Sequence, residues 1–310
     1  MDIYAPKYYK KFKCIADKCL HSCCIGWEID IDASTYEKYL KLDEKQRNAV
    51  LSTVSHDEDT AHFTLGKNGR CKNLDDRGLC KIISSLGEEY LCDICRLHPR
   101  FVNDLGTHIE IGLGLSCEEA VRIILTENEP FELVKIDENE DAAIDDLVYA
   151  DVLKMRNEII KSVEKREGTF FSKISKIKEK HDIKTDFYTF EEWAELLLSY
   201  EILNEEWGDL LKELLEKEPK CIESTFDSYF EALFKYLVYR HVSLAASELE
   251  FKARIAFSVL LTEIVVGLSE RENKLTEARL FDLVRLLSAE IEYSPDNTES
   301  LIFELETELM

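Results

Sequence analysis

The chain has 310 residues, 45% hydrophobic and 33% charged, so it is long enough for two domains and has a globular rather than disordered or collagen-like composition. Its formal net charge of −24 argues against a polyanion binder, and we expect no nucleic-acid partner. Residues 1–120 contain 16 basic and 20 acidic side chains, whereas residues 121–310 contain 23 and 43. The acidic second part would attract a lysine-rich partner, although a well-solvated helical surface explains the same charges.

The N-terminal sequence MDIYAPKYYKKFK lacks the apolar segment and small-residue cleavage site of a secretory signal. We therefore expect a cytoplasmic location, where thiols stay reduced. The longest apolar stretch, Ile255–Leu268, contains Glu263 and is shorter than the roughly 18–20 residues that cross a bilayer. No membrane span is expected.

Residues 1–117 hold eight of the eleven glycines and several short apolar runs separated by turn residues, which indicates short strands and loops. Strands are predicted at 62–65, 79–83 and 107–111. Turns are predicted at 75–78 and 103–106, because Asn and Asp bond to nearby backbone and Gly adopts positive φ. One helix is predicted from a capping box of Ser34 with Glu37, with an apolar stripe that continues to Leu51.

From Ser116 onward the pattern is helical. A second capping box, Ser116 with Glu119, predicts a helix that Pro130 ends. Helical periodicity continues over 144–163 and 193–203, the latter opened by Thr189 and Glu192, and over 224–246, 250–268, 275–292 and 298–309. The sequence thus predicts an α+β, mostly α protein, with a cysteine-rich head of short strands at 1–120 and an acidic α-helical domain at 121–310.

Cysteine is unevenly distributed, because nine of the ten lie in the first 117 residues and only Cys221 follows. The nine are Cys14, Cys19, Cys23 and Cys24 in a first group, and Cys71, Cys80, Cys92, Cys95 and Cys117 in a second. Zinc and iron–sulfur clusters bind soft thiolates, typically four per site, and Cys-x2-Cys is a common half-site. We predict that these nine cysteines are the metal ligands.

Other interpretations of the cysteines stay open. A disulfide framework is disfavoured by the expected compartment, and any single cysteine can be a buried small apolar residue. Cys92-x2-Cys95 could be a redox dithiol, but its flanks lack the βαβ setting of a thioredoxin-like motif. Nine thiols exceed the need of one zinc or one four-iron cluster, so there are two sites or some structural cysteines. The nearby histidines that could complete a mixed site are His21, His62, His98 and His108.

Four stretches combine these cysteines with distinctive flanking residues: Phe12–Asp32, Gly69–Cys80, Leu91–Phe101 and Ser116–Ala120. Taken in this order, they resemble the FliB-type flagellin lysine-N-methylases. The small CxxCxxCC proteins described as zinc or iron chelators are similar more loosely. Their first three cysteines are each separated by two residues, whereas here four residues separate Cys14 from Cys19 and three separate Cys19 from Cys23. The helical region fits the general shape of the methylase family but carries no recognised motif.

The resemblance implies transfer of a methyl group from S-adenosylmethionine to lysines of flagellin, in a protein whose cysteines carry an iron–sulfur cluster, 4Fe–4S, with zinc as the alternative. A lysine amine must lose its proton before it attacks the sulfonium carbon, so the site needs a base or a desolvated environment. The sequence identifies neither a catalytic base nor a cofactor pocket. Gly112-Leu-Gly114 comes nearest to a glycine-rich loop, and two glycines at a strand end more often serve a bend.

Two functions compete with the methylase. The first is a non-enzymatic zinc- or iron-binding scaffold, which would share the cysteine pattern without binding the cofactor. The second is an electron-transfer iron–sulfur protein. Within the methylase hypothesis a radical mechanism is disfavoured, because Cys19-x3-Cys23 is followed at once by Cys24 and the Cys-x3-Cys-x2-Cys spacing is absent.

Overall fold

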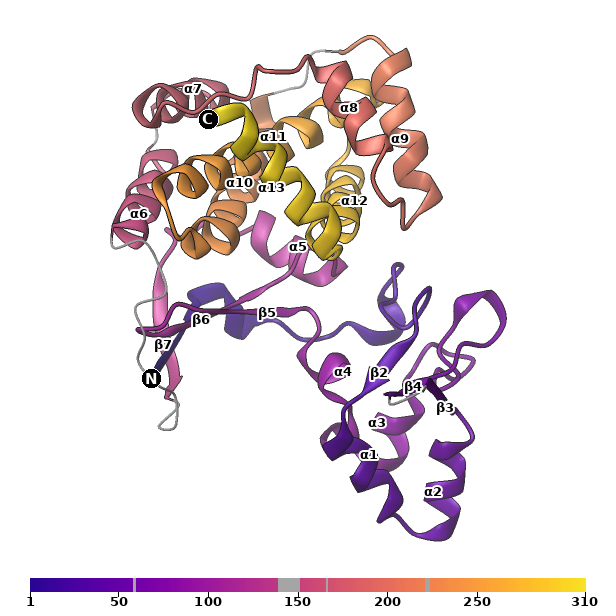
Figure 1. Cartoon of the computed structure of the whole chain (residues 1–310). Helices are drawn as coiled ribbons and strands as arrows, with labels where there is room; N and C mark the ends of the chain where they lie inside the picture. The colour runs from indigo at the N-terminus through magenta and orange to yellow at the C-terminus, as the bar shows by residue number, and fades with distance from the viewer. Residues whose placement is uncertain (58–59, 139–150, 166, 221–223) are drawn as a thin grey trace. The chain divides into compact units, whose positions relative to one another are not determined.

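The computed structural model describes residues 1–57, 60–138, 151–165, 167–220 and 224–310 (Figure 1). The fold is mostly α with short strands, which confirms the predicted class. Contacts divide the chain into two compact units, Lys13–Phe101 and Met1–Phe12 together with Val102–Met310. The first twelve residues and residues 102–120 therefore pack with the helical part, although the sequence places them with the cysteine-rich head.

The unit Lys13–Phe101 is built on a three-stranded antiparallel sheet of order β2-β4-β3. Its strands are β2 Ile29–Ile31, β3 Val54–Asp57 and β4 Thr60–Phe63; its helices are α1 Ala33–Leu40, α2 Glu44–Leu51, α3 Lys81–Leu86 and α4 Asp93–Leu97; and its short 3-10 turns are η2 Ala16–Lys18, η3 Lys67–Gly69 and η4 Glu88–Tyr90. One sheet face supplies Ile29, Ile31 and Phe63 to a core that also contains Tyr39 of α1.

Helices α1 and α2 begin at aspartates. Asp32 Oδ1 accepts a hydrogen bond from the Thr35 amide, and Asp43 Oδ1 accepts one from the Gln46 amide, each at 2.9 Å. The single helix predicted from a Ser34 cap was therefore wrong, because two N-cap aspartates start two helices and the Ser34 hydroxyl donates to Asp32 instead. The strand predicted at 79–83 was also wrong, since α3 occupies most of it; a short apolar run does not distinguish strand from helix.

The second unit contains a four-stranded mixed sheet of order β5-β6-β1-β7. Its strands are β1 Asp2–Pro6, β6 Ile109–Leu113, β7 Leu133–Glu138 and β5 Arg100–Asp104, of which Arg100 and Phe101 are counted with the other unit. Strand β1 pairs in parallel with β6 and antiparallel with β7, which explains why the N-terminus joins this unit. The predicted turn between β5 and β6 is confirmed by the Gly106 amide, which donates to Asp104 Oδ1 at 3.0 Å.

The rest of this unit is helical. The helices are α5 Glu118–Leu125, α6 Val152–Val163, α7 Phe170–His181, α8 Phe190–Leu198, α9 Glu205–Glu216, α10 Asp227–His241, α11 Glu248–Arg271, α12 Glu277–Leu287 and α13 Pro295–Leu309, with the shorter turns η1 Lys7–Lys11, η5 Ser224–Phe226, η6 Val242–Leu244 and η7 Ser288–Glu292, the last a π turn. Helix α11 is buried on nearly all sides and packs against α9, α10, α12 and α13.

The last four predicted helices are confirmed by α10 to α13, and the capping box of Thr189 with Glu192 is confirmed at the start of α8. The box of Ser116 with Glu119 was wrong: Cys117 is the N-cap of α5 without a side-chain cap bond, because Arg122 binds both oxygens of the Glu119 carboxylate. The first part of the predicted helix 144–163 lies outside the described residues. In the part of the chain that the structure describes, no helix combines the length and hydropathy of a transmembrane span.

Candidate metal centre

Five cysteines gather on the core of the unit Lys13–Phe101. Cys71 and Cys92 are buried in the core itself, and Cys24, Cys80 and Cys95 pack against it half-buried. They come from the loop before β2, from the segment after β4, and from the starts of α3 and α4. Segments that are far apart in the sequence thus bring thiols to one apolar core, where thiolate ligands of a metal would be shielded from water.

Backbone hydrogen bonds position Cys24, Cys71 and Cys80. The Cys71 amide donates to the Cys24 carbonyl at 2.9 Å, and Leu74 forms an isolated antiparallel bridge with Cys80. The predicted turn at 75–78 is confirmed, since the Gly78 amide donates to the Asp75 carbonyl at 3.0 Å and Gly78 has a φ of +80°. This turn reverses the chain between Cys71 and Cys80 and so returns the second thiol to the core.

Cys92 and Cys95 belong to the short helix α4. Cys92 is its N-cap and Cys95 lies three residues later, so both side chains lie on the same side of the helix. Asp32 fixes the start of α4 as well as that of α1, because its Oδ2 accepts from the Asp93 amide at 2.9 Å. The element before α4 is η4, not a strand, so this Cys-x2-Cys lacks the strand–helix setting of a thioredoxin-like motif.

Interactions between the thiols shift their pKa values. A hydrogen bond from Cys23 lowers the pKa of Cys24 to about 7, with further help from Ser22 and the charge of Arg70. A hydrogen bond between Cys92 and Cys95 lowers the pKa of Cys92 and raises that of Cys95. Burial raises the pKa of both Cys71 and Cys80. The charge of Cys24 also raises the pKa values of Cys71, Cys80 and Cys95.

The remaining cysteines predicted as ligands do not join this core. Cys14 is exposed and Cys19 is half-exposed in the segment around η2. Cys23 reaches the five core cysteines through a side-chain hydrogen bond with Cys24. Cys117 belongs to the other unit as the N-cap of α5. No disulfide joins any two of these nine described cysteines. Cys221 lies outside the described residues.

The histidines near the cysteines divide between the two units. His98 is the C-cap of α4, and burial, together with the charge of Arg100, lowers its pKa to about 4, so its imidazole is neutral near pH 7. His62 lies in β4, on the central strand of the sheet. His108 belongs to the other unit and contacts Glu110 at 3.3 Å.

The helical unit contains a buried ion pair that the sequence did not reveal. Glu110 of β6 and Arg156 of α6 are each 1% exposed and are joined by two hydrogen bonds of 2.5 and 3.0 Å. Ser243 accepts a further bond from Arg156 at 2.6 Å. Burial opposes the charge on Glu110, but the hydrogen bond from His108 and the charge of Arg156 outweigh it and lower the pKa of Glu110. The pair fixes the sheet to α6.

A second buried network holds the end of β6. Glu292 Oε1 lies 2.7 Å from His241 Nε2, and Tyr236 donates to Glu292 at 3.1 Å while it accepts from the Leu115 amide at 3.3 Å. At the neighbouring Gly114, a Cβ atom would overlap the side chain of Tyr293. A close approach of Tyr293 therefore requires this glycine, which agrees with a packing role for the Gly112-Leu-Gly114 segment.

A cavity of about 510 Å³ lies between α6 and α7. Its lining is rich in cations: Lys161, Lys165, Lys173, Lys176 and Lys180. The Nζ atom of Lys173 is held by Glu231 at 2.6 Å, and that of Lys180 by Glu158 at 3.1 Å. A lysine-lined cavity disfavours a sulfonium cation, so we do not assign the methyl donor to it.

Comparison with known proteins identified three curated relatives. The flagellar biosynthetic protein FliU of Salmonella muenchen is 28% identical over 132 residues, which cover 39% of this chain and 76% of that protein. Two proteins named lysine-N-methylase, from Salmonella typhimurium and Salmonella choleraesuis, are each 27% identical over 132 residues, which cover 39% of this chain and 32% of each relative.

The match therefore spans about a third of the length of the two lysine-N-methylases. No family model matches the chain, and no solved structure matches it. The curated matches agree with the family that the ordered cysteine motifs predicted. Over about two fifths of its length, the chain is thus similar to proteins named lysine-N-methylase and FliU.

Proposed function

We propose that this chain is a protein-lysine N-methyltransferase that uses S-adenosylmethionine, modifies flagellin, and holds an iron–sulfur cluster in the unit Lys13–Phe101, with zinc as the alternative metal. The observation that carries the proposal is the gathering of five cysteines on one apolar core. The names of the relatives, lysine-N-methylase and flagellar biosynthetic protein, support the reaction and the flagellar substrate. A cytoplasmic location, as expected from the sequence, would keep the thiols reduced.

The donor set fits the proposed metal. Four of Cys24, Cys71, Cys80, Cys92 and Cys95 suffice for one 4Fe–4S cluster or one zinc ion, and two of them, Cys80 and Cys92, are the N-cap residues of α3 and α4. When bound, such a group supplies a covalent cross-link of the loops, α3 and α4, and an iron–sulfur cluster adds one-electron redox capacity. Cys23, whose side chain is hydrogen-bonded to that of Cys24, is the nearest candidate for a further ligand.

The reaction places demands on the protein. The lysine ammonium first gives up a proton to water; the lone pair of the resulting amine then forms the new C–N bond while the S–CH3 bond breaks and the electron pair of that bond stays on sulfur. The sulfonium loses its charge, and S-adenosylhomocysteine leaves. The excess of 43 acidic over 23 basic side chains in residues 121–310 would attract a lysine-bearing protein substrate. Methylation should therefore slow as ionic strength rises.

The direct test uses the full chain purified without oxygen. We expect a brown protein with stoichiometric iron and sulfide, and transfer of labelled methyl from S-adenosylmethionine to lysines of flagellin from the same organism. The double variant Cys92→Ser/Cys95→Ser, which leaves three of the five core thiols, should lose the metal and the activity, whereas Cys14→Ser should keep both, because Cys14 is exposed and lies outside the core. Metal-replete protein that transfers no methyl group to flagellin would refute the proposal.

One observation favours the non-enzymatic scaffold as a second candidate. The described strands form a mixed sheet and an antiparallel sheet, neither of which is the parallel doubly wound sheet that commonly binds this cofactor, and the glycine pair at the end of β6 lies against Tyr293. Calorimetric titration with S-adenosylmethionine separates the two candidates. Saturable binding by metal-replete protein supports the methyltransferase, and its absence supports the scaffold.

A further inference from the structure

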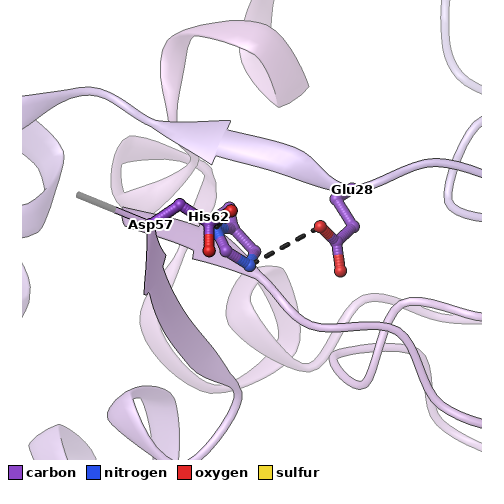
Figure 2. Close-up of side chains that lie close together, drawn as sticks. All are labelled: Glu28, Asp57 and His62. Carbon is purple, nitrogen blue, oxygen red and sulfur yellow. Dashed lines mark ion pairs between the residues drawn. The ribbon is translucent and has the colours of Figure 1, made fainter. Parts of the chain in front are cut away.

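The sheet β2-β4-β3 brings two carboxylates to one histidine. In the register of this sheet His62 of β4 lies opposite Asp30 of β2 and Ser55 of β3. Side chains alternate along a strand, so Glu28, two residues before Asp30, and Asp57, two residues after Ser55, project from the same face as His62. Figure 2 shows the three side chains together, with His62 between the two acids.

The three groups are close enough to share an ion. His62 Nε2 lies 3.6 Å from Glu28 Oε2, and His62 Nδ1 lies 3.6 Å from Asp57 Oδ2. One ligand atom from each residue can be chosen so that all three lie within 4.8 Å of one another. The cluster draws on residues of the same unit but on none of its cysteines, so it is distinct from the thiol core.

His62 is the buried member of the three, and the two acids are exposed. The side chain of His62 is only 7% exposed, whereas those of Glu28 and Asp57 are 54% and 81% exposed. Each ring nitrogen of His62 faces one carboxylate at 3.6 Å, Nε2 that of Glu28 and Nδ1 that of Asp57.

We propose that Glu28, Asp57 and His62 bind a divalent metal ion through one oxygen of each carboxylate and one imidazole nitrogen, with water in the remaining positions. In an octahedral site with ligands at about 2.1 Å, neighbouring donors lie about 3 Å apart and opposite donors about 4 Å apart. Rotation of the two exposed carboxylates brings donors that lie within 4.8 Å to those separations. The buried imidazole then supplies the fixed ligand.

The donor set also defines the class of metal. Carboxylates, water and imidazole suit ions such as Mn²⁺ and Fe²⁺, whereas thiolates select softer ions and clusters. The bound ion would join β2, β3 and β4 at the open face of the sheet, and its water positions would be accessible to an oxygen ligand. Mn²⁺ is the most selective probe, because it distinguishes this site from the cysteine core.

The test titrates the full chain, with its thiol-bound metal in place, with Mn²⁺ at physiological ionic strength and measures free Mn²⁺ by electron paramagnetic resonance. We expect one saturable site per chain. Glu28→Gln and Asp57→Asn should each raise the Kd at least tenfold, and both change exposed side chains without removing core contacts. A nitrogen coupling to bound Mn²⁺ should be present in the unaltered protein and absent in His62→Gln.

The matched control is His56→Gln, since His56 is another histidine of the same sheet but lies on β3 with its ring against Tyr36. Its Kd for Mn²⁺ should not change. The proposal is overturned if the protein shows no saturable site, or if Glu28→Gln and Asp57→Asn leave the Kd unchanged. Several weak sites that respond equally in all variants would show only general attraction of cations to an acidic protein and would also overturn it.

Discussion

Replacing Asp32 by alanine should loosen two helices at once. One oxygen of this carboxylate accepts the Thr35 amide at the start of α1, and the other accepts the Asp93 amide at the start of α4, each at 2.9 Å. Loss of an N-cap costs about 1 kcal/mol, and loss of a charged acceptor for a second amide about 1–2 kcal/mol. We expect a local destabilisation of about 2–3 kcal/mol, which is a rise of about 30- to 150-fold in the opening equilibrium.

Hydrogen exchange followed by mass spectrometry tests this expectation. Amides of α1 and α4 should exchange faster in Asp32→Ala, while those of α11 in the other unit serve as the internal reference. Asp43→Ala is the matched control, because Asp43 caps only α2 through Gln46 and should cost about 1 kcal/mol there alone. Equal effects of the two variants, or unchanged protection of α4 in Asp32→Ala, would refute the reasoning.

Three further predictions concern the helical unit. Gly267→Ala should destabilise the protein by about 1–2 kcal/mol in urea unfolding, because a Cβ there would overlap the Phe190 ring. This overpacking outweighs the gain in helix propensity, which is about 1 kcal/mol. Gly208→Ala is the control and should stabilise the protein, because its Cβ would have its nearest neighbour at 3.7 Å. Arg156→Met should cost about 3–5 kcal/mol, since it leaves the Glu110 carboxylate buried without its partner; a change under 1 kcal/mol in the unfolding midpoint would contradict this. The pKa of Glu110 is lowered in the folded state, so its ionisation contributes to the free energy of unfolding. This contribution is complete above the ordinary glutamate pKa of about 4.3 and is lost as the pH falls through the lowered pKa of the folded state. In acid titrations followed by circular dichroism, Glu110→Gln should flatten this part of the profile of stability against pH.

The sequence determined those features that depend on neighbouring residues. The amphipathic period of the C-terminal helices and the capping box of Thr189 with Glu192 are local, and both are confirmed. The order of cysteines and their flanking residues was sufficient to indicate the methylase family, which the curated relatives confirm over about two fifths of the chain. The turn between Cys71 and Cys80 was also predictable, because Asp75 and Gly78 specify it locally.

Tertiary structure decided what depends on pairing between distant residues. Only the folded unit shows that Cys24, Cys71, Cys80, Cys92 and Cys95 pack at one core, because they come from segments that are far apart in the sequence. Strand β1 joins the helical unit through its pairing with β6 and β7, and His62 meets Glu28 and Asp57 through strand register. Local propensity contains no information on which strands pair or which opposite charges become buried together, so the sequence alone leaves these contacts undetermined.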